Sequence, residues 1–246
     1  MHIVKVISGL ATLDKGEGVP VLFLHGYLSS KESFIFQTEY FSNYFRVIAF
    51  DFSGFGESEP LQYPYSLDDY VSKVRSLIDS LGLDRFHVIA HSFGARVAIK
   101  LALCDSRVDK LVLTGAAGLK PKRTLTYYYK VYSYKLLKKF LSPKRLEKFG
   151  SSEYKTLSPI MKKSYVLIVN EHLDKLARNV QNETLIIHGE NDRETPLYMA
   201  KKYKKLIKNS TLKVLKGCGH FAFIDDDFDF NLTALNFLSG EEDVKF

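Results

Sequence analysis

The most informative stretch of this 246-residue chain is Val88-Ile89-Ala90-His91-Ser92-Phe93-Gly94-Ala95. Its apolar first half predicts a strand, and the apolar residues that recur at helical spacing after it predict a helix. Ser92 therefore stands at a sharp strand-to-helix turn, with the small residues Ala90 and Gly94 two positions to either side. This is the local form of a nucleophile elbow, in which a tight turn projects a serine hydroxyl outward. The alternative interpretation is an ordinary turn with a capping serine.

Three further apolar runs end in residues that can carry chemistry. Residues 21–24 run into His25-Gly26, residues 184–187 lead into a loop that contains Asp192, and residues 212–215 precede Gly219-His220. A nucleophile, an acid and a histidine thus follow one another as Ser92, Asp192 and His220, each after a predicted strand. Serine hydrolases of different folds differ in this chain order, so the order itself is informative.

On these motifs the chain resembles the α/β-hydrolase superfamily, and within it the small capped serine esterases and C–C-bond hydrolases. The resemblance covers nearly the whole chain, and it includes the segment 51–58 and the loop 189–192 besides the motifs already quoted. It implies an α/β-hydrolase fold: a mainly parallel eight-stranded sheet with helices on both faces and an inserted helical cap.

The order of predicted strands and helices supports the same architecture. Alternation of this kind favours a parallel sheet covered on both faces, with ligands bound beyond the carboxyl ends of the strands. The predicted strands are 19–24, 46–50, 86–90 and 108–114, and the predicted helices are 31–41, 67–81 and 93–103. The N-terminal residues 1–9 are interpreted as a first edge strand.

The alternation stops after Gly118 and resumes at Thr184. The residues between them are helical in pattern and rich in Tyr and Lys, and a crossover needs only about a dozen residues. We therefore expect residues 1–118 and 181–246 to form the hydrolase core and residues 119–180 to form a helical cap, or lid. Ordinary crossover helices without a lid role are the alternative.

The resemblance assigns roles to the candidate site residues. Ser92 would be the nucleophile, His220 the base, and Asp192 the acid that orients the imidazole and stabilises its charged form. The backbone N–H groups of Tyr27 and Phe93 would form the oxyanion hole.

Other titratable residues compete for these roles. Glu190 and Glu194 flank Asp192, but the family's loop pattern selects Asp192. Asp51 follows a strand, and by resemblance it belongs to a structural turn. His25, His91 and His188 stand at strand ends, where packing or structural hydrogen bonds are expected. No spacing of ligands predicts a metal site, and no glycine-rich fingerprint predicts a dinucleotide cofactor, so we expect neither.

Composition limits the compartment and the partners. The net charge is +7, and residues 120–163 alone hold thirteen Lys and Arg against two acids. No nucleic-acid motif accompanies this charge, so nucleic-acid binding is not expected. The basic cap could also contact an anionic membrane, but this interpretation is less favoured. The N-terminus does not read as a signal peptide, no apolar run reaches a membrane span, and two cysteines give no disulfide framework. A cytoplasmic protein is expected.

The sequence favours a serine hydrolase that cleaves small carboxylic esters through an acyl-serine intermediate, as a carboxylesterase does. The alternative is a C–C-bond hydrolase of anionic diketo acids, whose substrates would suit a basic cap; thioesters, lactones, N-terminal proline peptides and peracid formation also stay open. A non-catalytic ligand receptor on the same fold is a further possibility, disfavoured because all three triad members are present. The partner is expected to be a small ester or related acyl molecule, and the sequence leaves the oligomeric state open.

Overall fold

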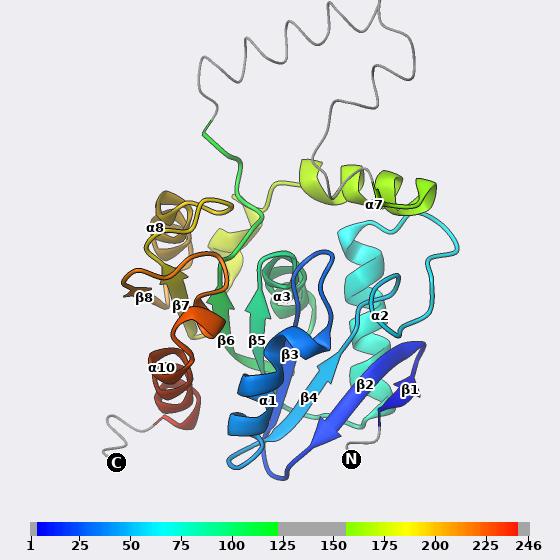
Figure 1. Ribbon diagram of the computed structural model, residues 1–246, viewed down its shortest axis with the longest axis horizontal. Helices are drawn as coiled ribbons and strands as arrows, with labels where there is room; N and C mark the ends of the chain where they lie inside the picture. Colours follow the sequence, from blue (N-terminus) through cyan, green and yellow to red (C-terminus); the bar gives the residue numbers. More distant parts are fainter. Residues whose placement is uncertain (1–3, 123–155, 241–246) are drawn as a thin grey trace, which may run out of the picture.

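The computed structural model describes residues 4–122 and 156–240. Eight strands form one sheet in the order β1-β2-β4-β3-β5-β6-β7-β8 (Figure 1). The six strands from β4 to β8 in this order pair in parallel, and β1 and β2 are added antiparallel at one edge. The predicted fold class is confirmed.

The strands are β1 (Lys5–Ile7), β2 (Leu10–Lys15), β3 (Pro20–Leu24), β4 (Arg46–Phe50), β5 (Phe86–His91), β6 (Val108–Thr114), β7 (Thr184–Gly189) and β8 (Ser210–Leu215). The described α-helices are α1 (Ile35–Phe41), α2 (Leu67–Ser80), α3 (Phe93–Cys104), α7 (Pro159–Asn170), α8 (Leu197–Leu206), α9 (Ala222–Asp225) and α10 (Asp227–Ser239). Two 3₁₀ helices, η1 (Lys31–Phe34) and η2 (Leu176–Asn179), complete the described elements.

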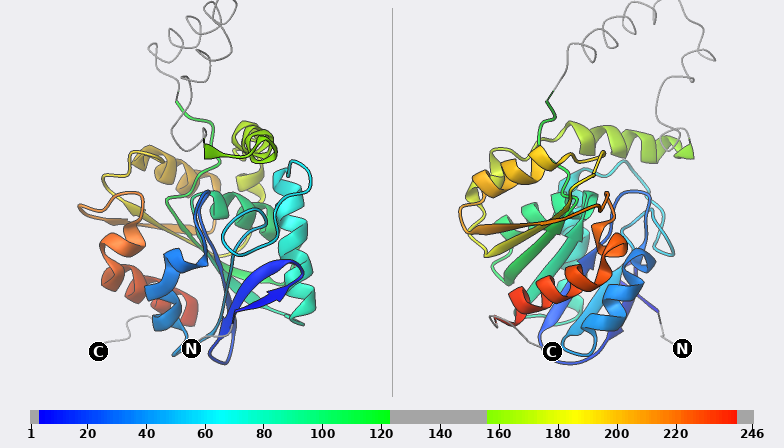
Figure 2. Two further views of the ribbon diagram at one scale, coloured as in Figure 1. Left: turned by 45° about the vertical axis from the view of Figure 1, so that its right-hand side comes forward. Right: turned by 60° about the vertical axis from the view of Figure 1, so that its left-hand side comes forward.

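The sheet is buried on both faces, as the apolar runs require. Successive strand residues point to opposite faces: in β3, Val21 and Phe23 pack into one core, and Leu22 and Leu24 into the other. Helices α1 and α10 cover the first face, and α2, α3 and α8 cover the second (Figure 2). Strands that are covered on both faces consist of nearly continuous apolar residues, and the sequence shows such runs.

The edge hairpin differs in part from the sequence prediction. The predicted first edge strand is present as β1, but the chain turns at Ser8-Gly9 and returns as β2, which the sequence analysis did not separate. Both turn residues have positive φ, 52° and 79°. Two residues with φ > 0 are typical of the tight turns that match the twist of a hairpin.

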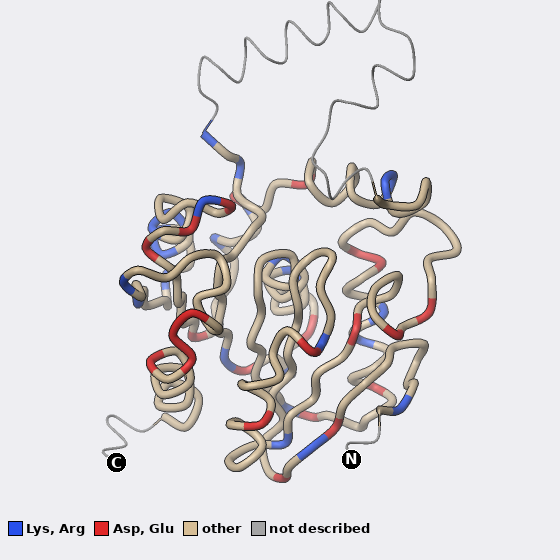
Figure 3. The backbone as a smooth tube through the Cα atoms, viewed as in Figure 1, with Lys and Arg blue, Asp and Glu red and all other residues tan. Residues whose placement is uncertain are grey.

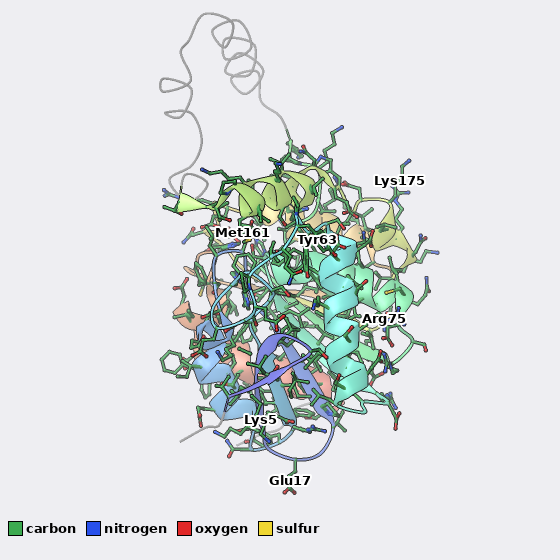
Figure 4. The ribbon with its side chains drawn as sticks, turned by 90° about the vertical axis from the view of Figure 1, so that its right-hand side faces the viewer. Lys5, Glu17, Tyr63, Arg75, Met161 and Lys175 are labelled. Carbon is green, nitrogen blue, oxygen red and sulfur yellow. The ribbon has the colours of Figure 1, made fainter. Side chains whose placement is uncertain are left out.

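Helix α7 lies between β6 and β7 in the chain, at the end of the sheet toward which β5 and β6 point (Figure 1). Its residue Met161 accepts a hydrogen bond from the Tyr27 hydroxyl through its carbonyl oxygen (3.3 Å), and Ser164 donates to the carbonyl oxygen of Tyr65 (2.7 Å). Figure 4 shows Met161 and Tyr63 at this end of the molecule and Glu17 at the opposite end. The tyrosine-rich stretch 127–134 and most of the basic segment lie outside the described residues.

The described surface carries both signs of charge. Lys and Arg are interspersed with Asp and Glu, and one acidic run stands at the start of α10 (Figure 3). Asp226 caps that helix by accepting a hydrogen bond from the Asp229 backbone. Within residues 4–122 and 156–240, no helix has both the length and the apolar character that crossing a bilayer requires.

Candidate active site

Ser92 lies at the predicted turn between β5 and α3, in a strained conformation. Its φ and ψ are 50° and −108°, which a residue with a side chain adopts only when the surroundings enforce it. The backbone N–H of Ser92 donates to the carbonyl oxygen of Thr114 (3.0 Å), and the carbonyl oxygen of Ser92 accepts from Ala95 and Ala117. These bonds hold the turn to the neighbouring strand β6 and to the first turn of α3.

Close packing requires the glycine at position 94, two residues after Ser92. A Cβ atom at Gly94 would overlap the carbonyl oxygens of Leu24 and His25, because the first turn of α3 packs directly on the end of β3. Ala90, at the other flank, is fully buried with its methyl group accommodated. The sequence pattern at the elbow therefore has one position that must be glycine and one that tolerates alanine.

Asp192 and His220 form a buried acid–imidazole pair. Oδ2 of Asp192 lies 2.9 Å from Nδ1 of His220, and the Asp192 side chain is fully buried. The same carboxylate accepts hydrogen bonds from the backbone N–H groups of Glu194 and Thr195 (both 2.9 Å) and from the Thr195 hydroxyl (2.7 Å). Burial alone would raise the pKa of Asp192, but the hydrogen bonds from His220 and Thr195 outweigh it and lower that pKa to about 2.

Ser92 and His220 line the same cavity, which has a volume of about 370 Å³. Within the described part of the chain, no hydrogen bond joins the Ser92 hydroxyl to His220. Nε2 of His220 instead lies 3.3 Å from Oε2 of Glu194, whose side chain is 65% exposed. Hydrogen bonds between catalytic groups often tighten only when substrate binds, so the nucleophile–base pair of Ser92 and His220 stays a prediction. Glu194, considered from the sequence as a rival to Asp192, occupies the other side of the same imidazole.

His91 supports the loop that carries His220. Its ring is buried, lies 4.6 Å from the His220 ring between centroids, and has Nε2 3.1 Å from the His220 carbonyl oxygen. A carbonyl oxygen only accepts, so Nε2 carries the hydrogen. Burial and the nearby His220 lower the pKa of His91 to about 3, so the ring stays neutral in ordinary conditions. His91 is therefore a structural residue, as its position before Ser92 predicts.

The candidate oxyanion-hole residues, Tyr27 and Phe93, line the same cavity. The buried His25 fixes the peptide that carries the Tyr27 N–H: its Nδ1 donates to the Gly26 carbonyl oxygen (2.7 Å), and its Nε2 accepts from the Phe52 N–H (3.0 Å). Because a trans peptide is planar, the Tyr27 N–H points away from the Gly26 carbonyl. Burial lowers the pKa of His25 to about 4, which preserves the neutral form that makes both bonds.

Asp51 has the structural role that the sequence analysis gave it. Its buried carboxylate accepts hydrogen bonds from the backbone N–H of Lys31 (2.7 Å), the Lys31 ammonium (3.0 Å) and the backbone N–H of Glu57 (2.9 Å). These bonds tie the loop after β4 to the segment that follows the Tyr27 loop. Asp51 is absent from the residues that line the cavity around Ser92.

Arg96 is a charged cavity residue that the sequence motifs do not single out. It lies four residues after Ser92 on α3, is 9% exposed, and lines the cavity together with Ser92 and His220. The spacing was a usable signal, because residues i and i+4 share one face of a helix. No group of three or more His, Cys, Asp and Glu suited to a metal ion occurs among the residues the structure describes.

Comparisons with known proteins place the chain in a family. The model of the α/β-hydrolase fold matches residues 19–143 and 122–227. The chain belongs to the α/β-hydrolase family. It is 28% identical, over 93% of its length and 92% of the relative's, to 2-hydroxy-6-oxo-2,4-heptadienoate hydrolase of Pseudomonas putida.

Solved structures of other family members superpose over nearly the full chain. A meta-cleavage product hydrolase of Pseudomonas fluorescens, solved with acetates, is 27% identical and has a TM-score of 0.74, with 97% of each chain covered. An esterase of Exiguobacterium antarcticum is 25% identical with a TM-score of 0.75, covering 94% of this chain and 95% of its own. These relatives are hydrolases of small molecules, and the family match and their names support hydrolase activity for this chain.

Proposed function

We propose that this hydrolase cleaves a carbon–carbon bond in small acidic diketo compounds of the 2-hydroxy-6-oxo-dienoate class. The observation that carries the proposal is the end-to-end similarity to the heptadienoate hydrolase, in a chain whose Ser92 cavity also holds a buried guanidinium. The sequence alone favours simple esters, with the C–C hydrolase as the alternative, and the comparisons favour that alternative. A cation in the pocket would favour an acidic substrate, and Arg96 lines the cavity around Ser92.

The reaction is a hydrolysis and balances without a cofactor. Water adds across the C5–C6 bond of 2-hydroxy-6-oxohepta-2,4-dienoate, giving acetate and 2-hydroxypenta-2,4-dienoate. Transfer of the 2-hydroxyl proton to C5 first gives the 2,6-dioxo tautomer, in which C5 is a CH2 group between the C6 carbonyl and the C3–C4 double bond. Ser92 then attacks the C6 carbonyl as His220 takes its proton. The electron pair of the C5–C6 bond passes to C5 and is delocalised onto the C2 oxygen, which takes the proton from His220 and gives 2-hydroxypenta-2,4-dienoate. Water next attacks the acyl-serine with His220 again as base, which releases acetate and restores Ser92.

The remaining site residues support these steps. Asp192 stabilises the imidazolium that forms on His220, through the 2.9 Å contact at Nδ1. The N–H groups of Tyr27 and Phe93 would bind the oxygen of C6 as it becomes anionic. We infer that residues 119–180 act as a cap, since Tyr165, Ile168 and Val169 of α7 line the cavity and would keep bulk water from it.

A carboxylesterase is the second candidate, and the similarity to the Exiguobacterium esterase favours it. The same three residues would cleave an ester, with an alkoxide instead of a carbanion as leaving group. The two candidates differ in what the pocket must recognise: an ester of a neutral acid needs no buried cation.

The deciding experiment compares substrates on the purified full chain. Turnover of 2-hydroxy-6-oxohepta-2,4-dienoate is followed by loss of its dienolate absorbance, beside a series of p-nitrophenyl esters of increasing acyl length. We expect kcat/KM for the dienoate to exceed that for the best ester at least about tenfold, and Ser92→Ala to lower kcat about 10³-fold or more. Preference for an ester, or a dienoate rate equal to that without enzyme, would refute the proposal. Absence of fluorophosphonate labelling at Ser92 together with no turnover of any substrate would indicate a non-catalytic receptor.

A further inference from the structure

Arg96 stands where two cavities meet. It lines the cavity around Ser92 and also a second one of about 330 Å³, which extends away from the serine toward Leu119 and Met199. The two cavities share five lining residues, Arg96, Ala117, Val169, Glu194 and Thr195. A substrate with two ends can therefore occupy both sides of the guanidinium while its reacting carbonyl lies at Ser92.

Only one of the three guanidinium nitrogens of Arg96 has acceptors among the described residues. Nη1 donates to the carbonyl oxygens of Ile168 and Glu171, both at 2.9 Å, at the C-terminal end of α7. A guanidinium has five N–H donors, and among residues 4–122 and 156–240 the structure gives no acceptor to Nε or Nη2. The nearby carboxylate of Glu171 is bound by Lys100 instead.

The charge of Arg96 also has no ion pair in this part of the chain. The Glu171 carboxylate is near enough to act on it, but no carboxylate among the described residues contacts the guanidinium, although a buried charge is normally paired because desolvation is costly. Burial lowers the pKa of Arg96 from its ordinary value, which reflects that desolvation. Glu194 lines the same cavities, but its carboxylate is largely exposed and lies against His220.

We propose that Nε and Nη2 of Arg96 bind the carboxylate of the substrate and so select for acids over neutral molecules of the same shape. The proposal rests on the acidic substrate class of the proposed function, and it names the residue that recognises that acid. The planar guanidinium fork matches a carboxylate with two parallel hydrogen bonds, which are strong because both partners are charged. Arg96 is thus a specificity-determining residue, distinct from the groups that move protons.

The competing interpretation is that Arg96 only ties α7 to α3. Lys100 gives a matched control, because it lies one turn further along α3, binds the Glu171 side chain at the same end of α7, and is absent from the lining of both cavities. Arg96→Gln removes the charge and keeps one donor toward the α7 carbonyls. Lys100→Gln loosens the same attachment without changing the cavity.

The test measures acid preference with two matched esters besides the dienoate: p-nitrophenyl hemiglutarate, which is an acid, and p-nitrophenyl pentanoate, which is neutral. We expect Arg96→Gln to lower kcat/KM for the dienoate and the hemiglutarate about 10- to 100-fold, mainly through KM, and to change the pentanoate less than about threefold. Lys100→Gln should leave the ratio of acid to neutral unchanged. An equal loss on acid and neutral esters in Arg96→Gln would overturn the proposal and leave only the tie to α7.

The ester pair separates this proposal from the proposed function. If the parent protein cleaves no dienoate but loses its preference for the hemiglutarate in Arg96→Gln, the C–C chemistry is wrong and the carboxylate site stands. If the dienoate is cleaved and Arg96→Gln does not affect its KM, the carboxylate site is wrong. Should Arg96→Gln fail to fold, Arg96→Lys keeps the charge but lacks the planar guanidinium fork. Two results together would then count against bidentate binding: an unchanged KM for acids in Arg96→Lys, and equal dissociation constants of the parent and the variant for sorbate, a dienoic acid.

Discussion

Glu194 and Asp192 lie against opposite nitrogens of the His220 ring: Oε2 of Glu194 is 3.3 Å from Nε2, and Oδ2 of Asp192 is 2.9 Å from Nδ1. The two carboxylates differ in exposure, since Asp192 is buried and Glu194 is largely in solvent. In the proposed mechanism Nε2 accepts the proton of Ser92. Glu194 would therefore compete with the proposed nucleophile for this nitrogen.

The first prediction follows from this competition. The Glu194 carboxylate lies 3.3 Å from Nε2 and lines the cavity, so it places a negative charge beside the proposed base. We expect Glu194→Gln to raise kcat/KM for an acidic substrate about two- to fivefold at low salt, because a negative charge leaves the cavity lining. The gain should shrink at high salt, since the Glu194 side chain is largely exposed and its charge is screened, and steady-state kinetics at two salt concentrations measure it.

The matched control for Glu194 is Glu190→Gln. Glu190 lies in the same loop and accepts a hydrogen bond from the Gly217 N–H, but it does not line the cavity. Its kcat/KM for the acidic substrate should match that of the parent protein at both salt concentrations. Equal kcat/KM values for all three proteins would mean that the Glu194 carboxylate has no effect on substrate in the cavity.

A second prediction concerns Thr195, whose hydroxyl donates to Oδ2 of Asp192, the oxygen that also contacts His220. Thr195→Val removes this donor in nearly the same volume, and about 10-fold loss in kcat is expected because the carboxylate is less precisely held. Asp192→Asn removes the charge itself and should cost about 10³- to 10⁴-fold. Steady-state kinetics on one substrate rank the three proteins, and a Thr195→Val loss as large as that of Asp192→Asn would contradict the assigned roles.

A third prediction, on stability, follows from the lowered pKa of Asp192. The pKa of Asp192 in the folded protein, about 2, lies below its value in the unfolded chain. Its contribution to stability is therefore fully present above about pH 4 and is lost as the pH falls toward 2. Urea unfolding between pH 5 and pH 2.5 should be less pH-dependent in Asp192→Asn than in the parent, and equal slopes would contradict the low pKa.

A fourth prediction uses the buried His91. Its pKa is lowered to about 3 in the folded protein, so below about pH 6.5 the unfolded chain binds a proton that the folded chain does not. Stability must then rise with pH across this window, and one such histidine accounts for about 2 kcal/mol between pH 5 and pH 7.5. We expect that difference in the free energy of unfolding to shrink by about this amount in His91→Gln.

A second buried histidine provides the control for His91. His25 also has a lowered pKa, about 4, and is unchanged in the variant. Some pH dependence should therefore remain in His91→Gln. If the variant loses as much stability as the parent between pH 7.5 and pH 5, the buried ring of His91 is not held neutral.

Much of the scaffold follows from local sequence. Ser66 caps α2 and forms a capping box with Asp69, and Gly82 follows the end of that helix with a positive φ of 62°. The elbow at Ser92 and the loop of Asp192 could also be placed, because each is a strand end with a characteristic residue pattern. These features depend on contacts within a few residues, which periodicity and turn chemistry report directly.

The features of the site that could not be predicted from the sequence depend on contacts between residues far apart in the chain. The carbonyls that bind Arg96 come from Ile168 and Glu171, more than seventy residues away, so neither the burial of that guanidinium nor its free donors can be read from spacing. The position of Glu194 at Nε2 depends on how the loops after β7 and β8 meet. The hairpin at Ser8-Gly9 is a different case, because its turn signal was present in the sequence and the edge was interpreted as one strand.

The last prediction tests whether the elbow depends on its glycine. In Gly94→Ala the new Cβ would overlap backbone oxygens at the end of β3, which cannot move aside as a flexible side chain would. We expect a loss of about 1–3 kcal/mol in the free energy of unfolding, and a large loss of kcat because the strained turn at Ser92 must shift. Gly82→Ala is the control: it has positive φ but open space around it, so it should cost about 1 kcal/mol from backbone strain and leave kcat unchanged. Equal kcat values in the two variants would show that the close approach of α3 to β3 does not position the serine.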